Sequence, residues 1–245
     1  MTIEEIERQM RSRETTYSRQ IPAGLWIILR LDGHGFSSLT ERHFQKPFDQ
    51  TFHRLMLQTA GVCLQAFEAV FATTGSDEIS LLLPPHYQQF NRRSEKILSL
   101  AAGLASSIFT RQSQQLGSFD CRIQATPFLE EVANYYHWRQ ADIQRNSIAT
   151  QSYWTLRQAG MTAAQTTARL RRTSWEDKER MLTEFGVQYK ALPGWQREGM
   201  ALRWERVEKQ GYDPIRQVQV SAVRRRLQEI PVAQALAELP GYLAS

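Results

Sequence analysis

The chain has 245 residues, of which 42% are hydrophobic and 22% are charged, and its formal net charge is +5 at pH 7. A chain of this length buries a substantial core, and it predicts either one domain with a large extension or two closely packed halves. Every apolar stretch falls short of the roughly 20 residues that cross a bilayer, which argues against a membrane protein. Cys63 and Cys121 are too few for a disulfide framework, so we expect a cytoplasmic location.

The first half alternates between short apolar runs and amphipathic segments. Hydrophobic side chains at spacings of three and four predict helices, and short β-rich runs predict strands. The expected elements are a strand at Leu25–Leu31, a helix at Asp49–Phe67, a hairpin of Ala69–Thr73 and Ile79–Leu83, a helix at Phe90–Thr110 and a strand at Phe119–Ala125. This order predicts an α+β fold with the ferredoxin-like βαββαβ arrangement.

The second half is predicted to be mainly helical, with a β-ribbon near its end. Helix formers and helical spacing indicate three helices, the first ended by Gly160 and the third capped by Ser174. Two further runs flank a Gly-Tyr-Asp-Pro turn. The expected helices are Leu129–Arg157, Ala163–Leu170 and Trp175–Phe185, and the expected ribbon strands are Met200–Lys209 and Ile215–Arg224.

Acidic residues stand at the ends of two predicted strands. Asp32 closes the first strand, and Asp77 with Glu78 opens the second half of the hairpin. In the predicted sheet these strands are neighbours, so Asp32 and Asp77 should meet at one edge. Converging carboxylates repel one another unless they share a cation, which favours a magnesium site with two ions about 3.5–4 Å apart. Gly33 would let its carbonyl approach a cation closely. The alternative is that both aspartates only cap turns.

Several basic residues are placed to meet phosphates. Lys46 precedes a predicted helix and could reach a triphosphate, although a solvated lysine is the alternative. Arg93 and Lys96 lie three apart near the start of the second helix, where they could clamp phosphates. Further clusters indicate a polyanionic partner, or else solvated faces. These clusters are Arg92, Arg93 and Lys96; Arg169, Arg171 and Arg172; and Arg224, Arg225 and Arg226.

On the long predicted helix, Arg139, Asp142 and Asn146 fall on one side at spacings of three and four. Such a polar row suggests that this side borders a groove, and an exposed polar stripe is the alternative. The five histidines show no zinc-ligand spacing with either cysteine. The sequence also lacks a Walker-type phosphate loop and a dinucleotide-binding glycine triplet.

Six segments taken together resemble the tRNA-His guanylyltransferase family, and more closely its tRNA-repairing relatives, the guanylyltransferase-like 3′-to-5′ polymerases. Their order and spacing fit most of the chain up to about residue 190. The segments are RLDGHGF (30–36), FQKPFD (44–49), TGSDEISLLL (74–83), FDCRIQATP (119–127), YYHWRQADIQRNS (135–147) and YWTLRQAG (153–160).

The resemblance implies a polymerase-like palm in residues 1–130 and a helical, fingers-like region with a C-terminal extension in residues 131–245. It implies two Mg²⁺ ions held by Asp32, the Gly33 carbonyl and Asp77, with Glu78 as a further catalytic carboxylate. The residues expected to bind nucleotide are Gly33, His34, Gly35, Phe36, Lys46, Ser76, Arg93, Lys96 and Asn146. The residues expected to bind RNA are Arg139, Arg171, Arg172, Arg224, Arg225 and Arg226.

Members of this family extend RNA from its 5′ end. ATP activates the 5′-monophosphate, and the 3′-hydroxyl of an incoming nucleotide attacks it; a 5′-triphosphate needs no activation. The resemblance therefore implies a 3′-to-5′ nucleotidyltransferase that uses tRNA, ATP, GTP and other nucleoside triphosphates. A homo-oligomer, either dimer or tetramer, is also expected.

Three departures from the guanylyltransferases proper favour templated repair of tRNA 5′ ends. Residues 144–147 read Gln-Arg-Asn-Ser where that group carries His-Ile-Asn-Asn, His34 replaces a usual arginine, and Phe48 replaces a common asparagine. In templated repair, base pairing selects the nucleotide and the protein recognises only shape and backbone.

Three alternatives stay open from the sequence. The first is a tRNA-His guanylyltransferase that adds a single 5′ guanosine. The second is a palm-fold nucleotidyl cyclase, because the acidic hairpin is similar in that group and fold alone cannot separate the two. The third is a noncatalytic RNA-binding module with the same order of strands and helices. Against the third, the first strand and the hairpin are aliphatic and end in carboxylates.

Overall fold

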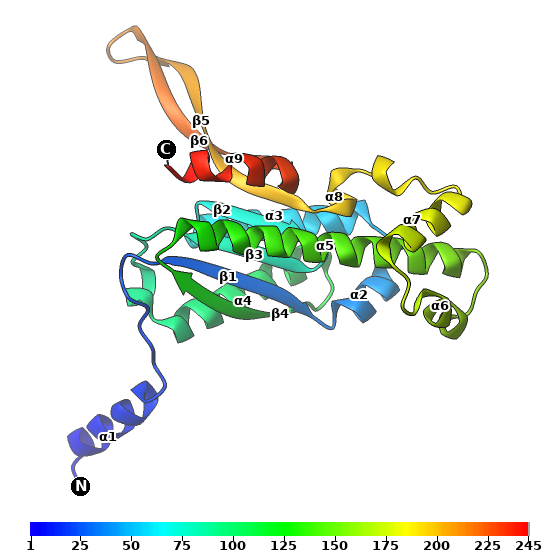
Figure 1. Cartoon of the computed structure of the whole chain (residues 1–245). Coiled ribbons are helices and arrows are strands. Elements are labelled where there is room, and N and C mark those ends of the chain that lie inside the picture. Colours follow the sequence, from blue (N-terminus) through cyan, green and yellow to red (C-terminus); the bar gives the residue numbers. More distant parts are fainter. Residues whose placement is uncertain (245) are drawn as a thin grey trace.

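The computed structural model describes residues 1–244, whose strands form a single antiparallel sheet in the order β4-β1-β3-β2-β5-β6 (Figure 1). Each neighbouring pair is antiparallel. The strands are β1 (Trp26–His34), β2 (Phe71–Gly75), β3 (Glu78–Leu83), β4 (Ser118–Thr126), β5 (Met200–Asp213) and β6 (Val218–Pro231). The expected order of strand, helix, strand, strand, helix, strand is therefore present in the first half.

The helices cover both faces of the sheet. They are α1 (Ile3–Thr15), α2 (Phe36–His43), α3 (Gln50–Ala66), α4 (Ser94–Ser113), α5 (Leu129–Gln158), α6 (Ala163–Leu170), α7 (Trp175–Glu184), α8 (Gly194–Arg197) and α9 (Val232–Ala244), with 3₁₀ turns at Gln89–Arg92 and Tyr189–Ala191. Ser174 caps α7 as predicted, and Asp49 caps α3 by accepting from the Phe52 amide. No helix in the described part of the chain is long and apolar enough to cross a membrane.

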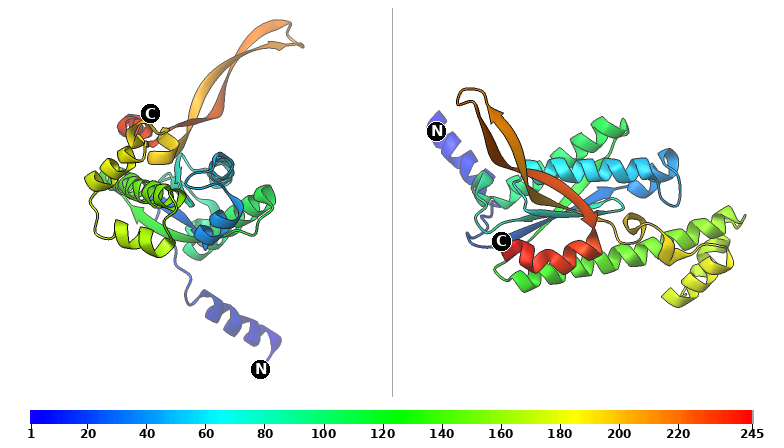
Figure 2. Two further views of the ribbon diagram at one scale, coloured as in Figure 1. Left: turned by 90° about the vertical axis from the view of Figure 1, so that its right-hand side faces the viewer. Right: turned by 90° about the horizontal axis from the view of Figure 1, so that it is seen from above.

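Alternate side chains of β1 face two separate cores. Leu29 and Leu31 pack with residues of α3 and α4 on one face, whereas Ile28 packs with residues of α5 and α9 on the other. Figure 2 shows the corresponding helices on opposite sides of the sheet. Because both faces are buried, β1, β2 and β3 consist mostly of apolar residues. The charged residues of β1 and β3 lie mainly toward one edge of the sheet.

The second half contributes more to the sheet than predicted. The strands β5 and β6 are longer than the expected ribbon, and the base of β5 pairs with β2 from Met200 to Arg203. Beyond this base the two strands continue as a twisted ribbon that projects from the body (Figures 1 and 2). The mixed α+β fold with a helical second half is confirmed, and the predicted ribbon is present as an extension of the sheet.

Four helices in the described part of the chain were not predicted, among them the short α8. No residue of α1 is buried, so its sequence carries no strong core-facing pattern, and it projects from the body on the side away from the ribbon. The short α2 begins at Gly35 in a left-handed conformation, and only Phe36 in it is buried. In α9, Pro240 interrupts a run that otherwise packs an apolar face against the sheet.

Candidate active site

The strand ends at one edge of the sheet border a cavity of about 460 Å³. Its wall is built from the end of β1, the β2–β3 turn, the segment between α2 and α3, the middle of α5 and the short α8. Eight of the residues predicted for the site line this cavity together: Asp32, Phe36, Lys46, Ser76, Asp77, Glu78, Arg139 and Asn146. Elements far apart in the sequence thus meet at the predicted edge.

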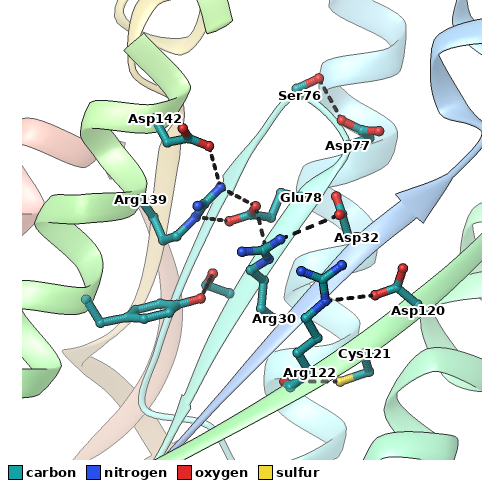
Figure 3. Close-up of polar contacts among 12 residues, drawn as sticks. Arg30, Asp32, Ser76, Asp77, Glu78, Asp120, Cys121, Arg122, Arg139 and Asp142 are labelled. Atoms are coloured by element: carbon teal, nitrogen blue, oxygen red, sulfur yellow. Dashed lines mark hydrogen bonds and ion pairs between the residues drawn. The ribbon is translucent and has the colours of Figure 1, made fainter. Parts of the chain in front are cut away.

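Pairing between β1 and β3 fixes the acidic residues relative to one another. Asp32 lies directly opposite Glu78 in the antiparallel register, and the Gly33 amide donates a 3.1 Å hydrogen bond to the Asp77 carbonyl. The predicted convergence of Asp32 and Asp77 is therefore present, and Figure 3 shows both at the strand ends.

The Asp77 carboxyl lies in an environment that disfavours its charge. Burial is the main cause that raises its pKa, and the neighbouring charge of Asp32 raises it further. A hydrogen bond from the Ser76 hydroxyl, 2.9 Å long, and the charge of Lys46 act in the opposite direction. A cation bound between these groups would relieve the repulsion.

The donor set at this edge suits magnesium rather than a metal held by protein side chains alone. Among residues 1–244, no group of three or more His, Cys, Asp and Glu side chains is arranged to hold a metal ion. Magnesium, however, is commonly bound by one or two carboxylates together with water and substrate phosphates. Asp32 and Asp77 on one cavity wall meet that requirement, so the residues fit the predicted ion.

Glu78 has a different environment from the two aspartates. Its carboxylate accepts a 2.7 Å hydrogen bond from Nε of Arg139 and another from Nη2, and Nε of Arg30 lies 3.4 Å away (Figure 3). Burial raises the pKa of Glu78, and Arg139 opposes that shift. Two guanidinium groups therefore already neutralise this carboxylate, which favours a positioning role over the direct catalytic role predicted.

Arg139, which was predicted to bind RNA, is largely buried beside the cavity. It is only 7% exposed, and its guanidinium holds both Glu78 and Asp142. Arg139, Asp142 and Asn146 do share the side of α5 that faces the cavity, as the helical spacing predicts. Arg139 is engaged with Glu78 and Asp142, and its contact with RNA stays a prediction.

Lys46 is the cavity residue best suited to a triphosphate. Its Nζ donates a 2.6 Å hydrogen bond to the Thr40 hydroxyl and lies 5.9 Å from the centre of the Trp154 ring. Burial lowers the pKa of Lys46, while Glu41 and Asp77 counteract this effect. The ammonium group is thus partly desolvated, which strengthens its attraction for an anion.

The glycine-rich stretch after Asp32 is shaped by packing. A Cβ on Gly33 would lie 2.5 Å from the Phe36 ring, so glycine is required there by the aromatic core as well as by any close approach to a cation. Phe36 itself is 1% exposed and contacts the rings of Phe109 and Phe119. Its edge lines the cavity, whereas His34 and Gly35 are exposed outside the cavity lining.

Arg93 and Lys96 lie far from this cavity, so their contact with nucleotide phosphates stays a prediction. Arg93 bridges to Gln20, and the adjoining Arg92 donates to the Leu25 carbonyl at the beginning of β1. Asp32 is seven residues further along β1, a distance of about 23 Å at the usual strand rise. The two residues therefore occupy the opposite end of the sheet.

The other predicted RNA contacts are exposed outside the cavity. Arg171 and Arg172 lie between α6 and α7. Arg224, Arg225 and Arg226 lie on the ribbon, where Arg226 is 2.7 Å from Glu205 and Arg225 is 5.5 Å from the Trp204 ring. Their contact with RNA stays a prediction.

Several aromatic side chains that sequence reasoning missed also line the cavity. His53 stacks on Trp195 with a centroid distance of 4.5 Å and an interplanar angle of 17°, and Phe48 meets Trp195 edge-on. Burial, with a smaller effect from Arg54, lowers the pKa of His53 to about 4, so this ring is neutral at pH 7. A flat, neutral aromatic wall of this kind can accept a nucleobase.

Two family models match the chain, one described as tRNAHis guanylyltransferase over residues 7–127 and one as Thg1 C terminal domain over residues 130–235. The chain belongs to the tRNA-His guanylyltransferase (Thg1) family. It is thus a Thg1-family 3′-to-5′ nucleotidyltransferase that acts on the tRNA 5′ end in tRNA processing. This membership confirms the resemblance and sets aside the cyclase and the noncatalytic RNA-binding module.

Individual Thg1 relatives are similar over most of the chain. A probable tRNA(His) guanylyltransferase of Drosophila melanogaster is 33% identical over 195 residues, which are 75% of this chain and 68% of the relative. One from Dictyostelium discoideum is 34% identical over 191 residues, which are 73% of this chain and 75% of the relative.

Solved structures are similar over nearly the whole chain. A bacterial tRNA(His) guanylyltransferase (Thg1)-like protein in complex with GTP has a TM-score of 0.75 at 25% identity, covering 98% of this chain and 100% of that chain. A bacterial Thg1-like protein in complex with ATP has the same TM-score at 26% identity, covering 98% and 99%.

Proposed function

We propose that this Thg1-family enzyme repairs tRNA 5′ ends by template-dependent 3′-to-5′ addition of nucleotides. One observation carries the proposal: two strand-end carboxylates, Asp32 and Asp77, line the same cavity as Lys46. Paired carboxylates suit attack of a hydroxyl on phosphorus, and the lysine suits a triphosphate. Similar bacterial proteins form complexes with GTP and ATP, which supports both nucleotides as substrates.

We propose that Asp32, Asp77 and the Gly33 carbonyl would hold two Mg²⁺ ions. When bound, such ions activate an attacking hydroxyl and neutralise charge on a leaving pyrophosphate. The chain's own residues would then position the nucleotide. Lys46 would pair with its triphosphate, and the base would rest near the aromatic wall of His53 and Trp195. The exposed Ser76 hydroxyl would turn from Asp77 to donate its one proton to a phosphate oxygen.

In the proposed reaction, the 3′-hydroxyl oxygen of the incoming nucleotide bonds to the 5′ phosphorus of the RNA. Pyrophosphate leaves when the RNA carries a 5′-triphosphate, and AMP leaves when ATP has first activated a 5′-monophosphate. The opposite RNA strand selects the nucleotide by base pairing, so the protein needs to recognise only the shape and backbone of the RNA.

The residues that replace His-Ile-Asn-Asn support the repair activity. Ser147 is buried, and its hydroxyl donates a 2.6 Å hydrogen bond to the Gln196 carbonyl and accepts one of 3.0 Å from Tyr189. It therefore joins α5 to the segment containing α8. Both residues line the cavity, but only Asn146 is exposed, so this stretch supplies little that could select one particular base.

We also propose that residues 1–130 form a palm-like catalytic unit and residues 131–245 a fingers-like helical region with its extension. The strand order β4-β1-β3-β2 with carboxylates at one edge supports the palm, and the two family models meet between residues 127 and 130. The base of the ribbon completes the sheet of the first unit.

The decisive experiment supplies tRNAs that lack the first 5′ nucleotide, with each of the four bases at the template position. Each tRNA is incubated with ATP, Mg²⁺ and all four nucleoside triphosphates, and the added nucleotide is identified. Additions that follow the template base support repair. Addition of guanosine opposite every base overturns templated repair.

The second candidate is addition of a single guanosine to tRNA-His. The family models and the curated relatives, which are tRNA-His guanylyltransferases at 33–34% identity, favour it. Full-length tRNA-His that lacks only the extra guanosine separates the two activities. An enzyme of the guanylyltransferase type adds one guanosine to it and stops, whereas a repair enzyme prefers truncated tRNAs of any identity.

A further inference from the structure

Two arginines stand directly opposite one another beside the candidate active site. Arg30 on β1 pairs with Arg122 on β4 in the antiparallel register, so both side chains project from the same face of the sheet. That face is the one covered by α5, because Arg30 contacts the carboxylate of Glu78, which is bound to Arg139. Figure 3 shows the two guanidinium groups side by side, next to Asp32.

This arrangement lacks a strong internal counter-charge for Arg122. Like charges directly opposite on neighbouring strands destabilise a sheet. The nearest acid, Asp120, is 3.8 Å from Arg122 Nε, and both side chains are more than half exposed, so the pair contributes little to stability. Arg122 is therefore an exposed cation that is free to meet an anion from solution.

An exposed tryptophan adjoins the same ion-pair network, because its ring contacts Arg139, which shares the Glu78 carboxylate with Arg30. Trp138 on α5 is 51% exposed, yet its ring is held by the Arg139 guanidinium at 4.6 Å and by the edge of Tyr135 at 5.9 Å. Tyr135 in turn hydrogen-bonds Ser80 on β3, which anchors this part of α5 to the sheet. The result is a rigid, solvent-facing aromatic plate next to the residue that holds Glu78.

Access to these side chains is open on one side. The strand β4 is the outermost strand of the sheet, and Asp120, Arg122 and Gln124 on it are exposed. A large partner can therefore approach across β4 without displacing a helix. None of these residues lines the cavity that contains Lys46, so the nucleotide and this partner need not compete.

We propose that Trp138 and Arg122 form a subsite for the end of the RNA substrate. Trp138 stacks on the terminal base or base pair, and Arg122 contacts a backbone phosphate next to it. An aromatic plate with an adjacent arginine is the combination that binds nucleotides without selecting their sequence. The inference rests on the proposed function, and it assigns the RNA end to the β4 side of the carboxylates.

The experiment measures RNA binding separately from turnover. The probe is an acceptor-stem RNA hairpin with a 5′-triphosphate and 2-aminopurine at its terminal position. Stacking on a tryptophan quenches 2-aminopurine fluorescence. We expect the parent protein to quench the probe, Trp138→Leu to abolish quenching and raise the Kd for the hairpin about tenfold, and Trp138→Phe to retain most of the affinity.

The arginine is tested on its own, because Arg122 is exposed on an edge strand and its replacement leaves the core intact. We expect Arg122→Gln to weaken hairpin binding several-fold and to reduce the dependence of log Kd on log salt by somewhat less than one. Arg122→Lys should keep part of the hairpin affinity and part of the salt dependence. Matched controls are Tyr17→Ala and Arg11→Gln, which alter exposed residues of the N-terminal segment.

Binding of GTP and thermal unfolding are measured for every variant. Unchanged GTP affinity with weaker hairpin binding and an increased KM for RNA supports the subsite. Hairpin affinity and quenching that match the parent in both Trp138→Leu and Arg122→Gln overturn it. If the parent extends no tRNA but the variants still lose stacking, the proposed function fails while the RNA subsite stands.

Discussion

Arg139 on α5 donates hydrogen bonds from Nε and Nη2 to the two carboxylate oxygens of Glu78, the first residue of β3. The side chains are only 8% and 11% exposed, and the pair joins the helical second half of the chain to the edge of the sheet that carries the carboxylates. Glu78 lies opposite Asp32, so this ion pair fixes the position of the strand end at the candidate site.

Arg139→Met should destabilise the protein strongly. It leaves the buried Glu78 carboxylate with only Arg30 at 3.4 Å, and removal of one partner of a buried ion pair costs about 3–5 kcal/mol. Urea unfolding of Arg139→Met, Glu78→Gln and the double variant measures the interaction free energy between the two side chains. The double variant should recover much of the loss, because no buried charge is left unpaired. Equal stability of Arg139→Met and the parent would contradict the structural role given to the pair.

Asp77→Asn should abolish nucleotide addition while changing RNA affinity little. The substitution keeps the size of the side chain but removes the charge needed beside Asp32 for a divalent cation. Addition of nucleotides to the 5′ end of a truncated tRNA, followed on a denaturing gel, gives the activity. Fluorescence anisotropy with labelled tRNA gives the affinity. Glu14→Gln is a matched control, since Glu14 is an exposed acidic residue outside the cavity lining. Nucleotide addition by Asp77→Asn at the parent rate would remove Asp77 from the catalytic machinery.

The same variant should reveal a pH dependence of stability. Burial and Asp32 raise the pKa of Asp77 in the folded state, so ionising it opposes folding. Its contribution to the free energy of unfolding therefore declines as pH rises from the unfolded value of about 3.9 through the raised pKa. Above that window, without Mg²⁺, Asp77→Asn should melt at a higher temperature than the parent. Adding Mg²⁺ should raise the melting temperature of the parent more than that of the variant.

Lys46 should make GTP affinity depend on pH. Burial lowers its pKa in the free protein, and only the protonated ammonium attracts the triphosphate. Affinity should therefore fall as pH rises through that lowered pKa. Lys46→Arg should flatten the dependence because guanidinium stays charged, and Lys46→Met should bind weakly at every pH. Calorimetric titration with GTP over pH 6 to about 10 checks this, provided that circular dichroism shows the fold intact. A parallel pH profile in Lys46→Met would assign the titration to another group.

Arg224, Arg225 and Arg226 on the ribbon are expected to contribute to tRNA binding through its phosphates. Replacing all three with Gln should lower the slope of log K against log salt by about 2–3 and weaken every tRNA alike. The change in the salt slope should be smaller than three phosphate contacts would give, since Arg226 is already paired with Glu205. Arg171→Gln with Arg172→Gln tests the cluster between α6 and α7 in the same way. An unchanged salt slope would exclude the ribbon from the RNA path.

Local sequence patterns were enough to predict the edge of the sheet that carries the carboxylates, because each strand and turn at that edge is formed by residues close together in the sequence. Apolar runs ending in Asp32 and Asp77 define two strands and a hairpin, and antiparallel pairing of neighbours brings their ends together. The polar side of α5 followed from helical spacing in the same way. By contrast, Trp195 lines the cavity because the chain folds back onto α5. Long-range contacts such as the hydrogen bond from Ser147 to the Gln196 carbonyl hold it there, and no local pattern indicates them.

The separation of Arg93 and Lys96 from the cavity has a topological cause. Their local prediction was sound, since α4 begins at Ser94. However, β3 starts at the carboxylate edge with Glu78 and runs away from it, so a helix that follows β3 must begin at the opposite edge. The buried ion pair of Arg139 was not predicted, for a related reason. Its partner Glu78 is 61 positions away, and no spacing along α5 indicates that pairing.

At the edge of the sheet opposite the carboxylates, one buried arginine joins several chain segments, and this leads to a final prediction. Arg92 is 2% exposed, and its guanidinium donates hydrogen bonds of 2.8 to 3.2 Å to four backbone carbonyls. These are the carbonyls of Ile21, Leu25, Pro85 and Tyr87. Arg92→Met leaves all four without this donor, so the free energy of unfolding should fall by more than about 3 kcal/mol.

Arg92→Lys should be intermediate, because an ammonium group has three donors and lacks the planar fork. Arg93→Gln is the control, since Arg93 is partly exposed and its partner Glu95 lies 3.2 Å away at the surface. Urea unfolding measures all three variants. Because Arg92 lies at the end of the sheet opposite Asp32, kcat for Arg92→Met should match the parent at temperatures where the variant stays folded. A large loss of kcat in folded Arg92→Met would show that the two ends of β1 are coupled.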